Sequence, residues 1–252
     1  YTIKELRFGG AGFPTNVTNP QIYESELINK TEEFISKLLD KDLFSGTILI
    51  AKENEILYEK ACGEASKRFH VLNNIETKFN LGSMNKMFTA TAIMQLVEKK
   101  ILNLNDPISK YIDESWLPNE ITNKITIHHL LSHTSGLGSY WTDKYENTSR
   151  RMLRTIEDFK VLVKDDTLAF EPGKKFKYSN TGMLLLGVVI EKSTNQDYFD
   201  YIRQNIYKPS GMINSDSFEM DQPVENIAIG YYSTPNNEFG WENNLFINVI
   251  KG

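Results

Sequence analysis

Cysteine is nearly absent from the 252-residue chain, since Cys62 is the only one. A single cysteine excludes an internal disulfide and any zinc site built from several cysteines. Cys62 stands between two small residues, Ala61 and Gly63, at the end of a strand-like run. We therefore interpret it as a small core residue and not as a reactive thiol.

The sequence also lacks a long apolar run. One of its most apolar stretches, residues 183–190, is followed directly by Glu191 and Lys192. A membrane-spanning helix needs about 18–20 consecutive apolar residues. We predict no membrane span in this chain.

Runs of basic residues are missing as well. The 28 Lys and Arg residues are outnumbered by 33 Asp and Glu, which gives a net charge of -5, and the lysines are scattered along the chain. This pattern would not attract a phosphate backbone, so we exclude nucleic-acid partners. With 40% hydrophobic and 24% charged residues, the composition is that of a globular protein with a substantial core.

The pattern of apolar residues predicts the order of the secondary structure. Residues 1–20, with several glycines and prolines, are interpreted as an extended lead-in. A helix is expected over residues 23–39 and a β-hairpin over residues 46–61. Residues 83–99 hold no Gly or Pro and carry apolar side chains all round, which predicts a buried helix. Further helices are predicted at residues 126–133, 156–164, 183–192 and 198–207, and further strands near residues 227–232 and 246–250.

These elements predict an α+β fold in which an antiparallel sheet is flanked by helices and interrupted by an inserted, mostly helical region. We assign residues 21–102 and 223–252 to the sheet domain and residues 103–222 to the helical region. The functional site is expected between these two parts.

Ser83 and Lys86 are the first residues that suggest chemistry. They stand at positions i and i+3 in the first turn of a predicted helix, so their side chains are neighbours and one can take the other's proton. The helix N-terminus also favours negative charge developing on the serine oxygen. Both features suit a nucleophilic serine. The alternative is that Ser83 only caps the helix and that Lys86 is a chance neighbour.

Tyr178 and Asn180 form a second pair. They follow the turn signal Pro172-Gly173 and precede an apolar helix, so we expect both in a short extended link, projecting to the same side. A phenol beside a lysine ammonium can relay a proton, and an amide can donate to a substrate or accept from it. The alternative is that Tyr178 packs its ring in the core.

The two pairs occur together with a third motif, in a fixed order along the chain. The motifs are Ser83-Met84-Asn85-Lys86 within residues 79–90, His133-Thr134-Ser135-Gly136 within residues 130–137, and Tyr178-Ser179-Asn180 within residues 176–182. Together they resemble the landmarks of the class C β-lactamase and penicillin-binding-protein-like serine hydrolases. A further stretch, residues 200–212, resembles the helix and turn that follow in that family. The resemblance covers residues 27–212, and the combination is much more specific than any single motif.

The resemblance implies a β-lactamase/transpeptidase-like fold and acyl transfer through a covalent acyl-Ser83 intermediate. It implies Ser83 as the nucleophile, Lys86 and Tyr178 as the base and acid pair, and Asn180 as a substrate-contacting amide. The implied substrate is an ester, a D-amino-acid peptide of the peptidoglycan type, or a β-lactam. No cofactor and no metal are implied, the oligomeric state is left open, and a periplasmic or extracellular location is expected.

Two alternatives stay open. The same fold can serve as a non-hydrolytic penicillin-binding sensor or receptor, and a sensor that stays acylated would keep the same four residues. The histidines His128, His129 and His133 suggest zinc, because His129 and His133 are four residues apart on a predicted helix, but no carboxylate pattern completes a site. The other interpretation of these histidines is that they cap and pack a helix end.

A further family motif, a Lys or His followed one residue later by Gly on an inner strand, is not found. Lys208-Pro209-Ser210-Gly211 is only superficially similar, because a proline and a position after a helix do not suit an inner strand. We therefore expect the chain to be C-terminally incomplete, with a missing segment supplying the remaining strands.

Overall fold

The computed structural model describes residues 23–219 and 221–244. It divides between Ile75 and Glu76 into two compact units. The predicted grouping of residues 223–252 with residues 21–102 stays a prediction. The predicted strand near residues 246–250 and the lead-in of residues 1–20 lie outside the described residues.

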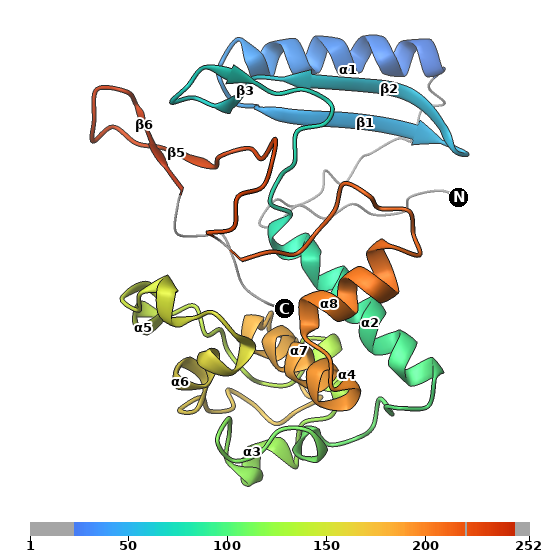
Figure 1. Ribbon diagram of the computed structural model, residues 1–252, viewed down its shortest axis with the longest axis vertical. Coiled ribbons are helices and arrows are strands. Elements are labelled where there is room, and N and C mark those ends of the chain that lie inside the picture. The colour runs from blue at the N-terminus through green and yellow to red at the C-terminus, as the bar shows by residue number, and fades with distance from the viewer. Residues whose placement is uncertain (1–22, 220, 245–252) are drawn as a thin grey trace. The chain divides into compact units, whose positions relative to one another are not determined.

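The first unit consists of a helix and short antiparallel strands (Figure 1). Its elements are α1 (Glu24–Leu39), β1 (Gly46–Lys52), β2 (Glu55–Cys62), β3 (Glu64–Ser66) and β4 (Val71–Leu72). β1 and β2 pair as the predicted hairpin, and its turn residues Glu53 and Asn54 both have positive φ, 49° and 72°. Two successive residues of this kind form the tight turn that matches the twist of a hairpin. Tyr58 in β2 donates to Glu32 in α1 over 3.0 Å, which ties the helix to the strands.

The second unit is mostly helical. Its helices begin with η1 (Gly82–Asn85), α2 (Lys86–Glu98), η2 (Ile108–Lys110), α3 (Asn119–Thr122) and α4 (Ile127–Leu131). They continue with α5 (Asp143–Glu146), η3 (Arg150–Met152), η4 (Ile156–Phe159), α6 (Lys160–Val163), α7 (Asn180–Thr194), α8 (Tyr198–Ile202) and the π-helical η5 (Arg203–Tyr207). The strands β5 (Tyr231–Ser233) and β6 (Trp241–Asn243) follow. The predicted helices at residues 126–133, 156–164, 183–192 and 198–207 are all present, some divided into shorter pieces.

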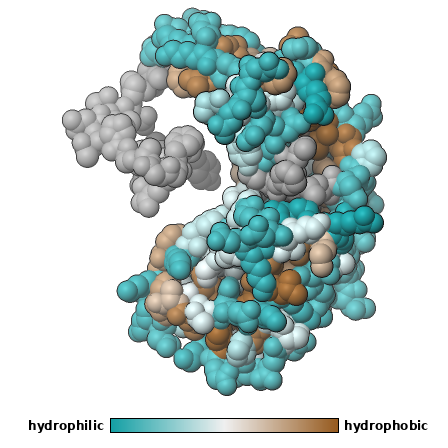
Figure 2. All heavy atoms as spheres, turned by 90° about the vertical axis from the view of Figure 1, so that its left-hand side faces the viewer, coloured by the Kyte–Doolittle hydropathy of each residue, from teal (hydrophilic) through white to brown (hydrophobic). Residues whose placement is uncertain are grey.

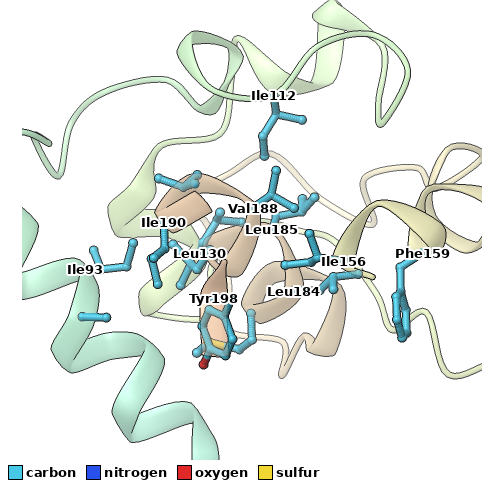
Figure 3. Packing of buried hydrophobic residues seen from close by; sticks show 14 of the residues in the cluster. Ile93, Ile112, Leu130, Ile156, Phe159, Leu184, Leu185, Val188, Ile190 and Tyr198 are labelled. Carbon is cyan, nitrogen blue, oxygen red and sulfur yellow. The ribbon is translucent and has the colours of Figure 1, made fainter. Parts of the chain in front are cut away.

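The core of the second unit is built around α7. Every residue from Thr181 to Ile190 is buried, and α7 packs against α2, α4 and α8. Figure 3 shows Leu184, Leu185 and Val188 of α7 among apolar side chains of these neighbours. Burial of a side chain of this size contributes about 1.5–3 kcal/mol. The first turn of α7, which carries Asn180, is therefore held by a rigid scaffold.

The helix α2 is buried on one side only, which corrects the predicted burial all round. Phe88, Ala92, Ile93 and Leu96 are buried, whereas the side chains of three methionines are 47–60% exposed. The exposed ones are Met84, in η1 directly before α2, and Met87 and Met94 in α2. The spacing of seven residues puts Met87 and Met94 on one stripe of α2, away from the core. Figure 2 shows apolar residues reaching the surface in patches among hydrophilic ones.

The predicted single sheet is also corrected in part. In the part of the chain that the structure describes, the strands form three separate two-stranded antiparallel sheets, β1 with β2, β3 with β4 and β5 with β6. Near residues 227–232, only Tyr231 and Tyr232 belong to a strand, while Ile227 makes an isolated bridge with Lys78. The strands β3 to β6 have only two or three residues each, which is too few backbone groups to build a wide sheet.

The turn at Gly136 gives a first testable prediction. Gly136 has a φ of +83°, and a Cβ added to it would lie 2.4 Å from the Phe170 carbonyl oxygen. Gly211 has a similar φ of +66°, but nothing lies within 4 Å of its Cβ position. We expect Gly211→Ala to lower the free energy of unfolding by about 1–2 kcal/mol through backbone strain alone. Gly136→Ala adds a backbone clash, so we expect a loss of about 2–5 kcal/mol. Urea unfolding of both variants measures the difference, and equal losses would contradict the role of the clash.

Candidate active site

Ser83 lies in the 3₁₀ turn η1, directly before α2. Gly82 enters this turn with a φ of +54°, and its N–H donates to Asn80 Oδ1 over 2.7 Å. Lys86 begins α2, and its Nζ donates to Ser83 Oγ over 3.2 Å. The N-cap residues of η1 and α2 are Leu81 and Asn85, so Ser83 does not cap a helix. Ser83 and Lys86 are therefore in contact, as predicted. The alternative that Ser83 caps the helix is wrong.

Tyr178 reaches the same oxygen from a distant part of the sequence. Its Oη donates to Ser83 Oγ over 2.9 Å, and Lys86 Nζ lies 5.3 Å from the centre of its ring. The side chain is 46% exposed, so Tyr178 is not a core tyrosine. The structure thus brings Ser83, Lys86 and Tyr178 together, all within the second unit.

Asn180 is fixed by a neighbouring loop. It is the first residue of α7, and its Nδ2 donates to Ser139 Oγ over 3.1 Å. The residue between it and Tyr178, Ser179, is extended and fully buried, with φ -134° and ψ 112°. Ser179 Oγ accepts from Gly182 N over 2.8 Å as the N-cap of α7 and donates to the Gly138 carbonyl over 2.7 Å. Ser179 therefore anchors both the helix and the link that carries Tyr178.

His133 packs directly against Tyr178. The two ring centres are 4.7 Å apart, with the planes inclined by 35°. His133 Nδ1 accepts from the Ser179 N–H over 3.2 Å. Burial, and secondly the charge of Lys86, lower the pKa of His133 below its usual 6.5. The imidazole is therefore predominantly neutral at neutral pH.

The zinc alternative finds no support in the geometry of the histidines. The helix α4 ends at Leu131, and His133 has a φ of 55°, so His129 and His133 do not share a helical face. His129 Nδ1 accepts from the Thr126 N–H over 3.2 Å, which makes it part of a capping box at the start of α4. Across residues 23–219 and 221–244, no group of three or more His, Cys, Asp or Glu side chains is arranged to hold a metal ion. The interpretation of His129 as a residue that caps a helix is the one the contacts favour.

Most of the chain corresponds to one protein family. Residues 31–244 match the Beta-lactamase family model. This chain belongs to the Beta-lactamase family. The predicted family resemblance is thereby confirmed, and with it the β-lactamase/transpeptidase-like fold.

Several known proteins are similar to this chain over much of its length. Penicillin-binding protein 4* of Bacillus subtilis (strain 168) is 34% identical over 197 residues, which is 76% of this chain and 43% of that protein. A penicillin binding protein from Bacillus halodurans is similar in structure, with a TM-score of 0.75 and 34% identity, over 84% of this chain and 64% of that one. EstCE1, described as a hydrolase with promiscuous acyltransferase activity, has a TM-score of 0.73 and 25% identity, over 87% of this chain and 59% of that one.

The chain spans less than half the length of the curated relative from Bacillus subtilis. The predicted incompleteness at the C-terminus stays a prediction. Lys208-Pro209-Ser210-Gly211 forms a turn directly after η5, in which Met212 N donates to Tyr207 O over 2.9 Å, so it is not an inner strand. No helix in the described ranges combines the length and the apolar character that crossing a bilayer requires.

Three residues at the site were not predicted to have a role there. The role of Ser179 does have a signal in the sequence, since a serine directly before an apolar helix is a typical N-cap. His133 was considered only as a zinc ligand or as a residue that caps and packs a helix end. Ser139 has no signal in the sequence, since its role depends on a contact with Asn180 across 41 residues.

Proposed function

We propose that the chain forms the nucleophile-bearing part of a serine acyl hydrolase in which Ser83 is transiently acylated. The observation that carries this proposal is that Ser83 Oγ lies 3.2 Å from Lys86 Nζ and 2.9 Å from Tyr178 Oη. A serine hydroxyl is a weak nucleophile on its own, and neighbouring groups that can hold its proton activate it. Here two such groups reach the oxygen of one exposed serine.

In the proposed reaction, Ser83 Oγ forms a bond to the carbonyl carbon of the substrate and passes its proton to the Lys86 and Tyr178 pair. One member of the pair must be deprotonated to accept this proton, while the other, still protonated, donates to the oxygen. The tetrahedral intermediate then releases the leaving group, which receives the proton from the same pair. Water repeats these steps on the acyl-Ser83 ester and restores the serine.

Asn180 is assigned to substrate binding. Ser139 accepts one of the two Nδ2 hydrogens of the amide, so the other Nδ2 hydrogen and Oδ1 are the groups we assign to the substrate. The buried Ser179 beside it keeps this orientation without contacting the substrate itself.

The substrate class is proposed from the chemistry and from the relatives. An ester, a D-amino-acid peptide of the peptidoglycan type and a β-lactam each offer a carbonyl with a leaving group. The names of two relatives include penicillin binding, and a third is called a hydrolase with acyltransferase activity. If a peptidoglycan peptide is the substrate, the protein acts outside the cytoplasmic membrane.

Intact-mass measurement after incubation with a fluorescent phosphonate and, separately, with a penicillin tests this proposal. We expect a single adduct from each reagent, and hydrolysis of a chromogenic ester or cephalosporin. A penicillin adduct that persists without any turnover would favour the sensor alternative. No adduct with either reagent would contradict acylation of Ser83.

A further inference from the structure

His133 contacts three consecutive residues of the link that carries Tyr178. Its carbonyl oxygen accepts from the Lys177 N–H over 2.9 Å, its ring stacks on Tyr178, and its Nδ1 accepts from the Ser179 N–H over 3.2 Å. Its own N–H donates to the Leu130 carbonyl at the end of α4 over 3.2 Å. One residue therefore joins the end of α4 to the whole link.

The backbone of His133 is held in an uncommon conformation to make these contacts. Its φ of 55° lies in the left-handed region, where asparagine, aspartate and histidine are several-fold enriched. Such a conformation costs about 1–3 kcal/mol and persists where the surroundings enforce it. A residue that served only to end the helix would not need an aromatic ring with an acceptor nitrogen.

We propose that His133 is a positioning residue for Tyr178, whose neutral imidazole holds residues 177–179 so that the phenol reaches Ser83, and whose protonation releases this hold. The inference rests on the proposed function for its catalytic consequence, but the coupling between His133 and Tyr178 does not require a substrate. Because Nδ1 accepts a hydrogen bond, the proton of the neutral ring is on Nε2. Protonation puts a hydrogen on Nδ1, and the Ser179 N–H loses its acceptor.

The sign of the pH dependence follows from the surroundings of His133. The titratable groups that face it from other elements in the described chain are Lys86 on α2 and Tyr178 on the link, while Lys177 meets it only through its backbone N–H. Burial first and Lys86 second lower the pKa of His133 below 6.5, so unfolded chains bind this proton more readily than folded ones. The resulting stabilisation is fully present above pH 6.5 and declines as the pH falls through the lowered pKa. Labelling of Ser83 is expected to decline over the same range.

A nuclear magnetic resonance titration tests the coupling directly. The protein carries ¹⁵N in its histidine rings and ¹³C at tyrosine Cζ, Tyr178→Phe assigns the tyrosine signal, and the pH is lowered from about 8 to about 5. We expect an unprotonated Nδ1 in His133 at neutral pH, and a Tyr178 signal that shifts with the same midpoint as His133. A protonated Nδ1 at neutral pH, or a Tyr178 signal that ignores the titration of His133, would overturn the proposal.

Two variants of His133 distinguish the contribution of its acceptor nitrogen from that of its aromatic ring. His133→Asn tolerates the positive φ and places an acceptor oxygen near the position of Nδ1, but it cannot titrate. We expect it to fold and to lose the decline of phosphonate labelling at acidic pH that wild type shows. His133→Phe keeps a ring but lacks the acceptor, and we expect labelling about 10- to 100-fold slower, as for a displaced catalytic group.

The exposed neighbour His128 supplies the matched control, because His128→Asn makes the same substitution on α4, away from the link. This variant is expected to keep both the rate and the pH profile of wild type. If His133→Asn retained the acid decline, or His133→Phe labelled at the full rate, the proposal would be wrong. If wild type did not label at all, the proposed function would fail, and the resonance titration would still decide the role of His133.

Discussion

Ser83→Ala is expected to abolish covalent labelling by a phosphonate or a penicillin while the protein stays folded. The side chain is exposed and caps neither η1 nor α2, so its loss removes little that stabilises the fold. Surface changes of this kind usually alter the free energy of unfolding by less than about 0.5 kcal/mol. The chemistry, by contrast, depends wholly on Oγ, the atom that both Lys86 and Tyr178 contact.

Intact-mass measurement and urea unfolding on the same preparation check both halves of this expectation. Ser149→Ala is the matched control, because Ser149 is an exposed serine before η3 whose side chain makes no capping hydrogen bond. The control should label at the wild-type rate. Full labelling of Ser83→Ala would show that another residue is the nucleophile.

Part of the candidate site was predictable because the contacts involved are local. A spacing of three residues on a helix puts two side chains within reach of each other, so the neighbourhood of Ser83 and Lys86 followed from their spacing. The hairpin of β1 and β2 was predictable for a similar reason, since its alternating strands meet at a two-residue turn. The contact between Tyr178 and Ser83 spans 95 residues, and no local pattern predicts it. We expected this contact only because the three motifs occur in the same order as in the class C β-lactamase and penicillin-binding-protein-like family.

The features that were missed depend on packing at a distance or on helix ends. The apolar residues of α2 indicated a helix in contact with a core, but composition does not distinguish which of them face that core. Likewise, a helix of ordinary length was expected to carry both His129 and His133, whereas α4 ends at Leu131. That early end puts His133 into the left-handed turn from which it reaches Tyr178.

Tyr140 and Trp141 show how side-chain contacts decide between two interpretations that a sequence leaves open, lining a pocket or anchoring a loop. Tyr140 is 4% exposed and packs edge-on against Tyr145 and Phe159, with ring centres 5.7 and 5.6 Å away. Trp141 packs against Tyr145 at 5.1 Å and its indole N–H donates to Glu146. Both therefore anchor the loop that presents Ser139 to Asn180.

Tyr178→Phe is expected to lower turnover by about 10²–10⁴-fold, the usual contribution of a positioned acid or base. The change removes a single oxygen, Oη, which lies 2.9 Å from Ser83 Oγ. It keeps the ring that stacks on His133 at 4.7 Å and faces the Lys86 ammonium at 5.3 Å, so the packing of the site should be retained. A loss of activity would then report the hydroxyl and not a displaced link.

Rates of phosphonate labelling and of ester hydrolysis, measured together, locate the step at which the hydroxyl acts. If both rates fall in parallel, Tyr178 assists the attack of Ser83; if only hydrolysis falls, it assists the later attack of water. Tyr232→Phe is the matched control, because Tyr232 is a tyrosine of comparable exposure, 41%, in β5 of the same unit, and it should react at the wild-type rate. A change of less than about threefold in Tyr178→Phe would be too small for a positioned acid or base. In that case Lys86, 3.2 Å from the serine oxygen, would handle the proton alone.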